Sequence, residues 1–92
     1  MPPLEGTIRR AVIKELRRRG VYHIPYPAGP YARRGVPALL ACIGGRFVGI
    51  ELKRPGAEPS PHQLLEHGRI EAAGGSVFVV RSVADLVQIG LE

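Results

Sequence analysis

Two apolar segments on either side of a glycine pair constrain the fold of this chain more than any other feature. Residues Ala38 to Ile43 and Arg46 to Leu52 are both of strand length, and Gly44-Gly45 between them is a two-residue hairpin signal. Strands joined by so short a turn must be antiparallel. The sequence therefore predicts a β-hairpin near the middle of the chain.

The segments that flank the hairpin predict two helices. Residues Leu4 to Arg19 carry apolar side chains at helical spacing and are followed by Gly20, a common helix stop. In Ser60-Pro61-His62-Gln63 the serine suits the N-cap, the proline suits the first helical position, and the glutamine completes a capping box. A second helix is therefore expected from here to about Ala73, with three charged side chains exposed: Glu66, Arg69 and Glu71.

Two more strands and a last helix complete the expected fold. Short strands are expected at Val21 to Ile24 and at Val77 to Val80, and Ser82 is expected to cap a final helix. The order is then helix, three strands, helix, strand and helix. This order predicts an α/β fold with a mixed sheet flanked by helices, in one domain that spans residues 1–92.

Charge and hydropathy limit the class of protein. The chain has 13 lysines and arginines against 8 aspartates and glutamates, and such a surplus favours a polyanionic partner. A solvated basic face that keeps the protein soluble is the alternative explanation. No apolar run approaches the roughly 20 residues of a membrane span, and the N-terminus lacks the pattern of a signal peptide. We therefore expect no membrane association and a cytoplasmic location.

Cysteine and histidine do not suggest a metal site. The single cysteine, Cys42, excludes an internal disulfide and a cysteine-based zinc site, and its apolar strand predicts a small core residue. His62 and His67 are five residues apart, which places them on different faces of the second helix. With His23 they are expected to be surface or packing residues, although His62 beside Gln63 is placed to approach DNA.

Glu51 and Lys53, at the end of the hairpin, form a candidate catalytic pair. Residues two apart on a strand point to the same face, so both side chains could face one phosphate. Hydrolysis of a phosphodiester needs an activated water and a counter-charge, which Mg²⁺ or Mn²⁺ held by carboxylates supplies. Glu51 would be a ligand, with the Leu52 backbone carbonyl as another, and Lys53 would stabilise the growing charge. An exposed salt bridge is the ordinary alternative.

Other polar residues could serve the same site. The proline-rich loop after the first strand carries Tyr31, Arg33 and Arg34, and these residues, with Arg54, are candidate DNA-binding residues. A proline-rich surface loop that does not bind DNA is at least as common. Glu5, at the start of the first helix, either complements the helix dipole or points into a site.

The joint pattern resembles a known family. The residues that carry the resemblance are Gly35-Val36-Pro37-Ala38, Gly44-Gly45-Arg46, Glu51-Leu52-Lys53, Pro55-Gly56 and Ser60-Pro61-His62-Gln63. Together they are similar to the VRR-NUC domain of the PD-(D/E)XK nuclease superfamily, in its small phage type. The resemblance runs from about Glu5 to Val80 and implies a restriction-endonuclease-like αβββαβ core.

The resemblance also implies an activity and roles for single residues. It implies a metal-dependent endonuclease, using Mg²⁺ or Mn²⁺, that acts as a homodimer on structured or branched DNA such as Holliday junctions. Glu51 then corresponds to a metal ligand and Lys53 to the catalytic lysine. Gln63 corresponds to an active-site support on the second helix, and Glu5 to the acidic residue of the first helix.

Ala38 departs from the family pattern. The family has an aspartate after this glycine-x-proline, and a methyl group cannot coordinate a cation. Metal affinity and turnover are therefore expected to fall sharply. Three explanations for Ala38 are open: a deliberate aspartate-to-alanine change, a naturally inactive relative, or relocation of the metal ligand to another residue. Asp85, the chain's one aspartate, lies in the last helix and is a poor substitute ligand.

Two other readings belong to different functional classes. The chain could be a DNA-binding or assembly module without catalysis, in which the same basic loop recognises the shape of a branch. It could also be an unrelated small mixed domain with a protein partner, which predicts weak DNA binding with little salt dependence.

Overall fold

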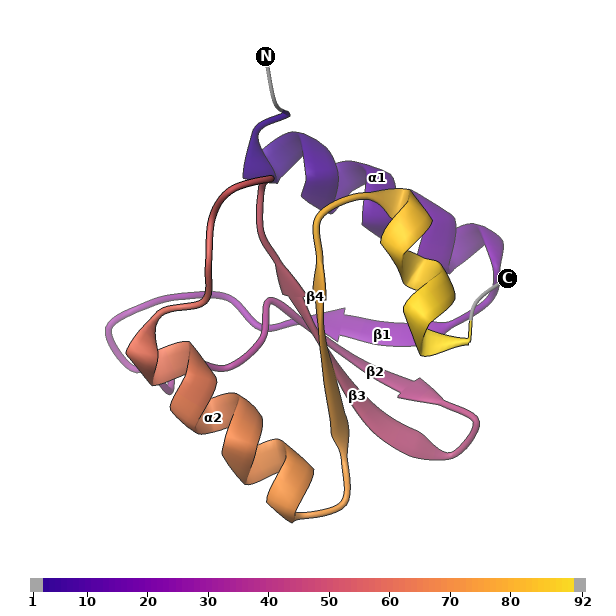
Figure 1. The fold of residues 1–92 in the computed structure, drawn as a ribbon. Coiled ribbons are helices and arrows are strands. Elements are labelled where there is room, and N and C mark those ends of the chain that lie inside the picture. The colour runs from indigo at the N-terminus through magenta and orange to yellow at the C-terminus, as the bar shows by residue number, and fades with distance from the viewer. Residues whose placement is uncertain (1–2, 91–92) are drawn as a thin grey trace.

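A four-stranded sheet with helices on both faces makes up the fold in the computed structural model, which describes residues 3–90 (Figure 1). The strands lie side by side in chain order. The elements are α1 (Glu5–Arg18), β1 (Tyr22–Pro25), β2 (Leu39–Ile43), β3 (Arg46–Leu52), α2 (Pro61–Ala72), β4 (Ser76–Val80) and the 3-10 helix η1 (Val83–Ile89). The predicted α/β fold is confirmed, with its αβββαβ order.

The central hairpin forms where the sequence predicts it. β2 and β3 pair antiparallel, with Ile43 opposite Arg46. The turn residues Gly44 and Gly45 have φ angles of 58° and 79°, which glycine adopts without strain. β1 pairs antiparallel with β2 on its outer side, whereas β4 runs parallel to β3 after the α2 crossover. The sheet is therefore mixed, with β1 and β4 at its edges.

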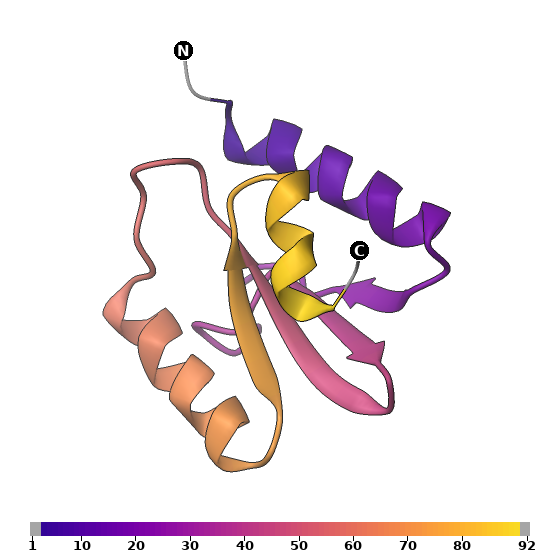
Figure 2. The same cartoon turned by 45° about the vertical axis from the view of Figure 1, so that its right-hand side comes forward.

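The main core lies between the sheet and two helices, α1 and η1 (Figure 2). The α1 residues Ile8, Val12 and Leu16 recur every four positions, so they form one apolar stripe. Alternate strand residues point to the same face and complete the core, which consists of Ile8, Val12, Leu16, Leu39, Ala41, Val48, Ile50, Leu52, Val80, Leu86 and Ile89. The residues between them on β3, including Glu51, point to the opposite face.

The second helix covers part of that opposite face. Its predicted capping box is confirmed: Ser60 Oγ accepts from the Gln63 N–H at 3.2 Å, and Gln63 Oε1 accepts from the Ser60 N–H at 2.8 Å. Arg69 and Glu71 are exposed as expected. The expected exposure of Glu66 is wrong, because Glu66 is buried beside two arginines.

The last helix forms where it is predicted, as the 3-10 helix η1. The predicted cap is wrong, because the Ser82 side chain makes no capping hydrogen bond. Asp85 Oδ2 instead accepts from the backbone N–H of Arg81 at 2.8 Å. The segment still packs Leu86 and Ile89 into the core. No helix within residues 3–90 is long and apolar enough to cross a membrane.

Cys42 is exposed rather than buried, so its prediction as a core residue is wrong. Leu39 and Ala41 on β2 point to the core, and strand alternation therefore turns Cys42 to the other face. Its cross-strand neighbours there are Tyr22 and Phe47, which are also exposed. This part of the sheet face, over β1 and β2, is not covered by α2.

Candidate active site

The end of β3 places the predicted catalytic pair on the face that α2 covers. Glu51 pairs with Val79 of β4, and the backbone N–H of Lys53 donates to Val80 O at 3.1 Å. These contacts extend the strand geometry through Lys53, so the side chains of Glu51 and Lys53 point to the same face. Both side chains line one pocket of about 400 Å³.

That pocket brings together the residues that the sequence singles out for catalysis and metal binding. Its lining includes Glu5, Ala38, Glu51, Leu52, Lys53 and Gln63. They come from the start of α1, the residue before β2, the end of β3 and the first turn of α2. The pocket therefore joins segments that are distant in sequence, and the roles assigned to these residues stay predictions.

Ala38 occupies the position beside Glu51. β2 and β3 pair with Leu39 opposite Ile50, and continuing this antiparallel register by one residue puts Ala38 opposite Glu51. Directly opposed residues have their Cβ atoms about 4.5–5.5 Å apart on the same face. The backbone carbonyl of Ala38 accepts from the Tyr26 N–H at 2.9 Å, which fixes the chain here. A carboxylate at position 38 would therefore stand next to that of Glu51.

The turn before Ala38 is held by close backbone contact with α2. Gly35 has a φ angle of 83°, and a Cβ added to it would lie 2.2 Å from the carbonyl oxygen of His62. Pro37 packs over Gly49 of β3, where an added Cβ would lie 2.7 Å from the proline ring. Only glycine fits at position 35. Because Gly35 and Gly49 have no side chains, the turn before Ala38 can pack closely against the start of α2 and against β3.

His67 is a site residue that the sequence analysis missed. Its Nε2 lies 3.2 Å from Glu51 Oε2, and both side chains are buried, with 8% and 4% of their surfaces exposed. The sequence analysis compared His67 only with His62, which lies on a different face of α2. Residues four apart share a helix face, so the spacing of His67 from Gln63 would have placed it on the side of the candidate site.

The surroundings of Glu51 change its ionisation. Burial raises the pKa of the Glu51 carboxyl above its ordinary value, and the negative charge of Glu5 adds to the rise. The hydrogen bond from His67 and the positive charge of Lys53 oppose this rise but do not cancel it. A charged carboxylate at this place is therefore costly to the fold, which is common in functional sites.

The residues present do not complete a site for Mg²⁺ or Mn²⁺. Within the described part of the chain, the only carboxylates that line the pocket are those of Glu51 and Glu5, and the methyl group of Ala38 offers no oxygen donor. The amide oxygen of Gln63 and the hydroxyl of Tyr26 already accept backbone hydrogen bonds. Residues 3–90 contain no group of three or more histidine, cysteine, aspartate or glutamate side chains that could hold a metal ion. A carboxylate at position 38 would add an oxygen donor opposite Glu51.

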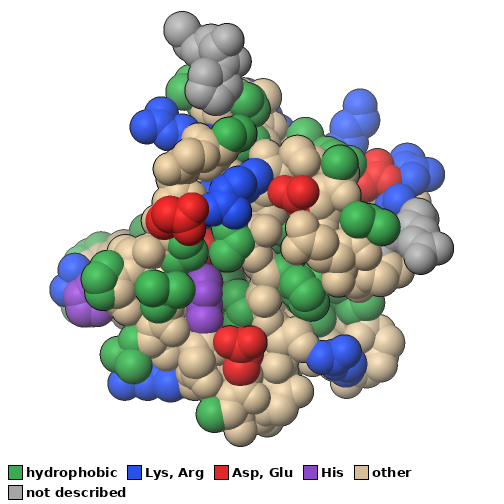
Figure 3. All heavy atoms as spheres, in the orientation of Figure 1, with side chains coloured by type: hydrophobic (Ala, Val, Ile, Leu, Met, Phe, Trp, Pro, Cys, Tyr) green, Lys and Arg blue, Asp and Glu red, His purple; other side chains and the backbone are tan. Residues whose placement is uncertain are grey.

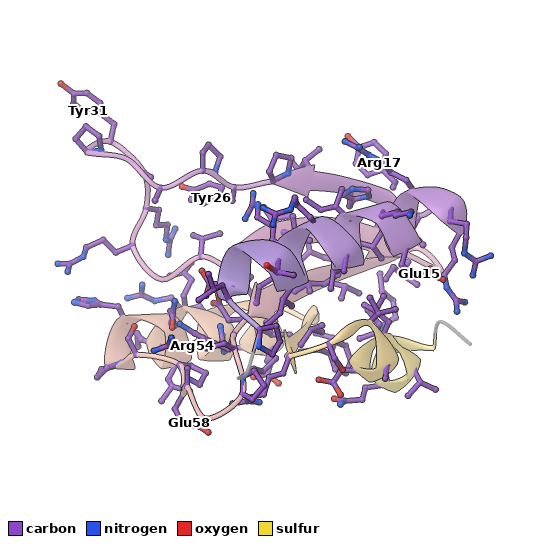
Figure 4. The ribbon with its side chains drawn as sticks, turned by 90° about the horizontal axis from the view of Figure 1, so that it is seen from above. Glu15, Arg17, Tyr26, Tyr31, Arg54 and Glu58 are labelled. Carbon is purple, nitrogen blue, oxygen red and sulfur yellow. The ribbon has the colours of Figure 1, made fainter. Side chains whose placement is uncertain are left out.

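None of the predicted DNA-binding residues, all of which the structure describes, lines this pocket, although Arg33 and Arg34 line a neighbouring hollow that shares Tyr26 and Gln63 with it. Tyr31 projects from the tip of the loop, away from the helices and sheet, and Arg54 lies nearer to them (Figure 4). The backbone N–H of Arg33 donates to the Tyr26 hydroxyl at 2.8 Å, and the side chain of Arg33 forms a salt bridge with Glu66. Lysines and arginines are scattered around the face in Figure 3 rather than gathered over one element. Net charge alone does not mark a DNA-binding surface.

Comparisons with known proteins agree with this geometry. No protein-family model matches the sequence. The chain is 39% identical over 79 residues to a protein of Acyrthosiphon pisum secondary endosymbiont phage 1 named "Putative nuclease p44", covering 85% of this chain and 83% of that protein. It is also similar to a solved structure described as a VRR_NUC domain, with a TM-score of 0.75, 28% sequence identity and coverage of 92% and 91% of the two chains. The reading as an unrelated small domain is therefore wrong: this chain belongs to the VRR-NUC family.

Proposed function

We propose that this chain is a VRR-NUC nuclease for structured or branched DNA, such as four-way junctions, whose Mg²⁺- or Mn²⁺-dependent cleavage is disabled by Ala38. The observation that carries the proposal is the pocket that holds Glu51, Lys53 and Gln63 together with Ala38. The β2–β3 register, continued by one residue, puts Ala38 opposite Glu51, at the position where the resemblance implies an aspartate. Family membership and the pocket support a nuclease scaffold, and in this proposal Ala38 weakens metal binding because its methyl group offers no oxygen donor.

The residues present define what the chain itself can contribute to phosphodiester hydrolysis. Lys53 presents an ammonium group to the pocket, where it stabilises charge on the phosphate and orients an attacking water. Gln63 offers an amide from the first turn of α2, while its Oε1 holds the helix start. Glu51 is oriented by His67. A divalent cation, when bound, would supply Lewis-acid activation.

A DNA-binding module without catalysis is the alternative, and Ala38 itself is the observation that favours it. In that case Arg33, Arg34, Arg54 and Tyr31 would recognise the shape of branched DNA. The binding would need no metal. A carboxylate restored at position 38 separates the two, because a scaffold that only binds DNA gains no activity from it.

The proposed protein acts as a homodimer in the cytoplasm of a bacterial or phage-infected cell. β1 is an edge strand, and it leaves backbone hydrogen-bonding groups open to a second strand. A dimer joined across this edge would hide them. Light scattering on the purified protein tests the dimer, and a monomer mass would contradict this part of the proposal.

The test of the function is DNA cleavage by the chain as it stands and by Ala38→Asp. A labelled four-way junction and a linear duplex of the same sequence are each incubated with Mg²⁺ and then with Mn²⁺. We expect Ala38→Asp to cut the four-way junction and the unchanged chain to cut neither DNA. Ala84→Asp, which adds the same charge at an exposed site on η1, is the matched control and should stay inactive.

A second variant checks that the activity uses the proposed site. Lys53→Ala in the Ala38→Asp background should abolish cutting and leave thermal stability nearly unchanged, because Lys53 is at the strand end and partly exposed. Cutting of neither DNA by Ala38→Asp, with junction binding retained, would support the non-catalytic module instead.

A further inference from the structure

A second hollow lies on the same face of β3 as the candidate active site. It has a volume of about 370 Å³ and is lined by apolar Phe47, Ile70 and Gly75 and by charged Arg33, Glu66 and Arg69. We call it the Phe47 pocket. Its size falls within the roughly 300–1,000 Å³ of small-molecule sites.

The Phe47 pocket and the candidate active site are linked by a third hollow that shares lining residues with both. This hollow has a volume of about 220 Å³. It shares Tyr26 and Gln63 with the candidate active site and Arg33 with the Phe47 pocket. A strand of DNA bound at Glu51 and Lys53 therefore has a path, lined by arginines, that ends in the Phe47 pocket.

The apolar wall of the Phe47 pocket depends on a glycine. Phe47 is a large aromatic residue that is 48% exposed. A Cβ added to Gly75 would lie 2.8 Å from Ile70 Cγ2 and 3.2 Å from Phe47 Cδ1. The φ angle of Gly75 is not in the left-handed region, so its backbone does not require glycine. Because Gly75 has no side chain, Phe47 and Ile70 can pack beside it. The phenyl ring of Phe47 then stays accessible to a ligand.

The charged wall is fixed by one buried carboxylate. Glu66 Oε1 lies 2.9 Å from Arg33 Nε, and Glu66 Oε2 lies 3.2 Å from Arg69 Nη1. The Glu66 side chain is 9% exposed, whereas those of Arg33 and Arg69 are 60% and 56% exposed. The carboxylate thus holds two guanidinium groups at the mouth of the pocket, while most of their surface stays available. A guanidinium group can stack on a base or donate to a phosphate.

We propose that the Phe47 pocket binds an unpaired nucleobase of the DNA that is held at Glu51 and Lys53. The base stacks on Phe47, and Arg33 and Arg69 contact the base or its phosphate. This proposal rests on the proposed function and deepens it, because it names a feature of the substrate. A base in a fully paired duplex would have to be unpaired and unstacked first, so an unpaired base enters more easily.

The spacing of the two sites suits one strand of DNA. Phe47 and Glu51 are four residues apart on β3, which corresponds to about 13 Å. Stacked DNA advances about 3.4 Å for each nucleotide, so the two sites are a few nucleotides apart at least. The base in the Phe47 pocket is therefore a few nucleotides from the phosphate at the candidate active site, as expected near a branch or a single-stranded end.

The test is a binding measurement in EDTA, so that cleavage has no part in it. Fluorescence anisotropy compares a blunt labelled duplex with the same duplex carrying a short single-stranded extension. We expect tighter binding of the extended duplex, and Phe47→Ala should weaken that binding by about 5- to 150-fold, the range that removal of one base-stacking aromatic ring typically produces. Binding of the blunt duplex should change little. Phe47→Tyr, which keeps a stacking ring, should retain the preference.

Leu65→Ala is the matched control, because Leu65 is an exposed apolar residue of α2 that does not line the Phe47 pocket. It should leave both affinities unchanged, and circular dichroism should show that each variant is folded. Equal binding of the two duplexes, unaffected by Phe47→Ala, would overturn the nucleobase pocket while DNA binding stands. Binding of neither duplex by any form would overturn the proposed function as well. Loss of a dimer in Phe47→Ala with DNA binding unchanged would instead assign the pocket to a contact between copies of the chain.

Discussion

Glu51 and His67 form a buried pair between β3 and α2, with 3.2 Å between Oε2 and Nε2. The imidazole N–H satisfies one oxygen of a carboxylate that water hardly reaches. Within residues 3–90 the other oxygen, Oε1, has no hydrogen-bond partner. His67 therefore sets the orientation of Glu51 and leaves one oxygen for a ligand in the pocket. The contact links the helix that carries Gln63 to the strand that carries Lys53.

Removing His67 should destabilise the fold. His67→Ala leaves a buried carboxylate without its donor, and we expect the free energy of unfolding to fall by about 2–4 kcal/mol. His67→Gln keeps an N–H donor and should recover part of the loss. Urea denaturation measures both changes. Equal stability of the wild type and His67→Ala would show that the pair does not hold Glu51.

Neutralising Glu51 should stabilise the fold at neutral pH. The pKa of Glu51 is raised in the folded state above the ordinary value of 4.5, so the folded chain binds this proton more tightly than the unfolded chain does. The resulting cost to stability is fully present above the raised pKa and absent below 4.5. Glu51→Gln should therefore melt at a higher temperature than the wild type at neutral pH.

The same reasoning fixes the pH dependence of this gain. The difference in melting temperature between Glu51→Gln and the wild type should shrink as the pH falls through the raised pKa toward 4.5. Thermal unfolding followed by circular dichroism across this range measures it. A variant that is less stable than the wild type at neutral pH would contradict the cost assigned to the buried charge.

Two glycines with similar backbone angles should respond differently to alanine. Gly35 and Gly20 have φ angles of 83° and 68°, but an added Cβ would strike the His62 carbonyl at Gly35 and nothing within 4 Å at Gly20. Gly20→Ala should cost about 1 kcal/mol for the left-handed backbone. Gly35→Ala should cost about 2–5 kcal/mol, because overpacking adds to the strain. Similar costs in urea denaturation would show that the turn can move away from α2.

The arginines around the pocket should account for the salt dependence of DNA binding. Arg34 is exposed and lines the hollow between the two pockets. If it contacts a phosphate, Arg34→Ala should reduce the slope of log affinity against log salt by about 1, on all DNA shapes alike. Arg17, near the end of α1 far from the loop tip in Figure 4, provides the control. An equal change in Arg17→Ala would mean that the effect comes from net charge.

Local features of the fold were predictable because neighbouring residues determine them. Gly44-Gly45 sets the hairpin, and Ser60 with Gln63 sets the start of α2. Ser82 shows the limit of this reasoning, since Asp85 takes a backbone N–H nearby and the segment winds as a 3-10 helix. In a short segment several local hydrogen bonds compete, and the sequence alone does not indicate which of them forms.

Burial of polar residues was not predictable in the same way. Glu66 and His67 look like surface residues of an amphipathic helix, yet both are buried. His67 contacts Glu51 of β3, and Glu66 pairs with Arg33 and Arg69. Cys42 looks like a core residue, yet it lies where α2 does not cover the sheet. These outcomes depend on which part of the outer face α2 covers, which is a tertiary contact. The residues that share the pocket were predictable as a group, because Glu51, Lys53 and Gln63 lie in or beside elements with clear local signals.

The most direct test of the central claim is metal binding at position 38. Isothermal titration with Mn²⁺ compares the chain as it stands, Ala38→Asp and the control Ala84→Asp. We predict a binding isotherm only for Ala38→Asp, because the register sets that carboxylate beside Glu51. Equal Mn²⁺ binding by the unchanged chain and Ala38→Asp, or binding by neither, would contradict the claim that Ala38 occupies the place of the missing ligand.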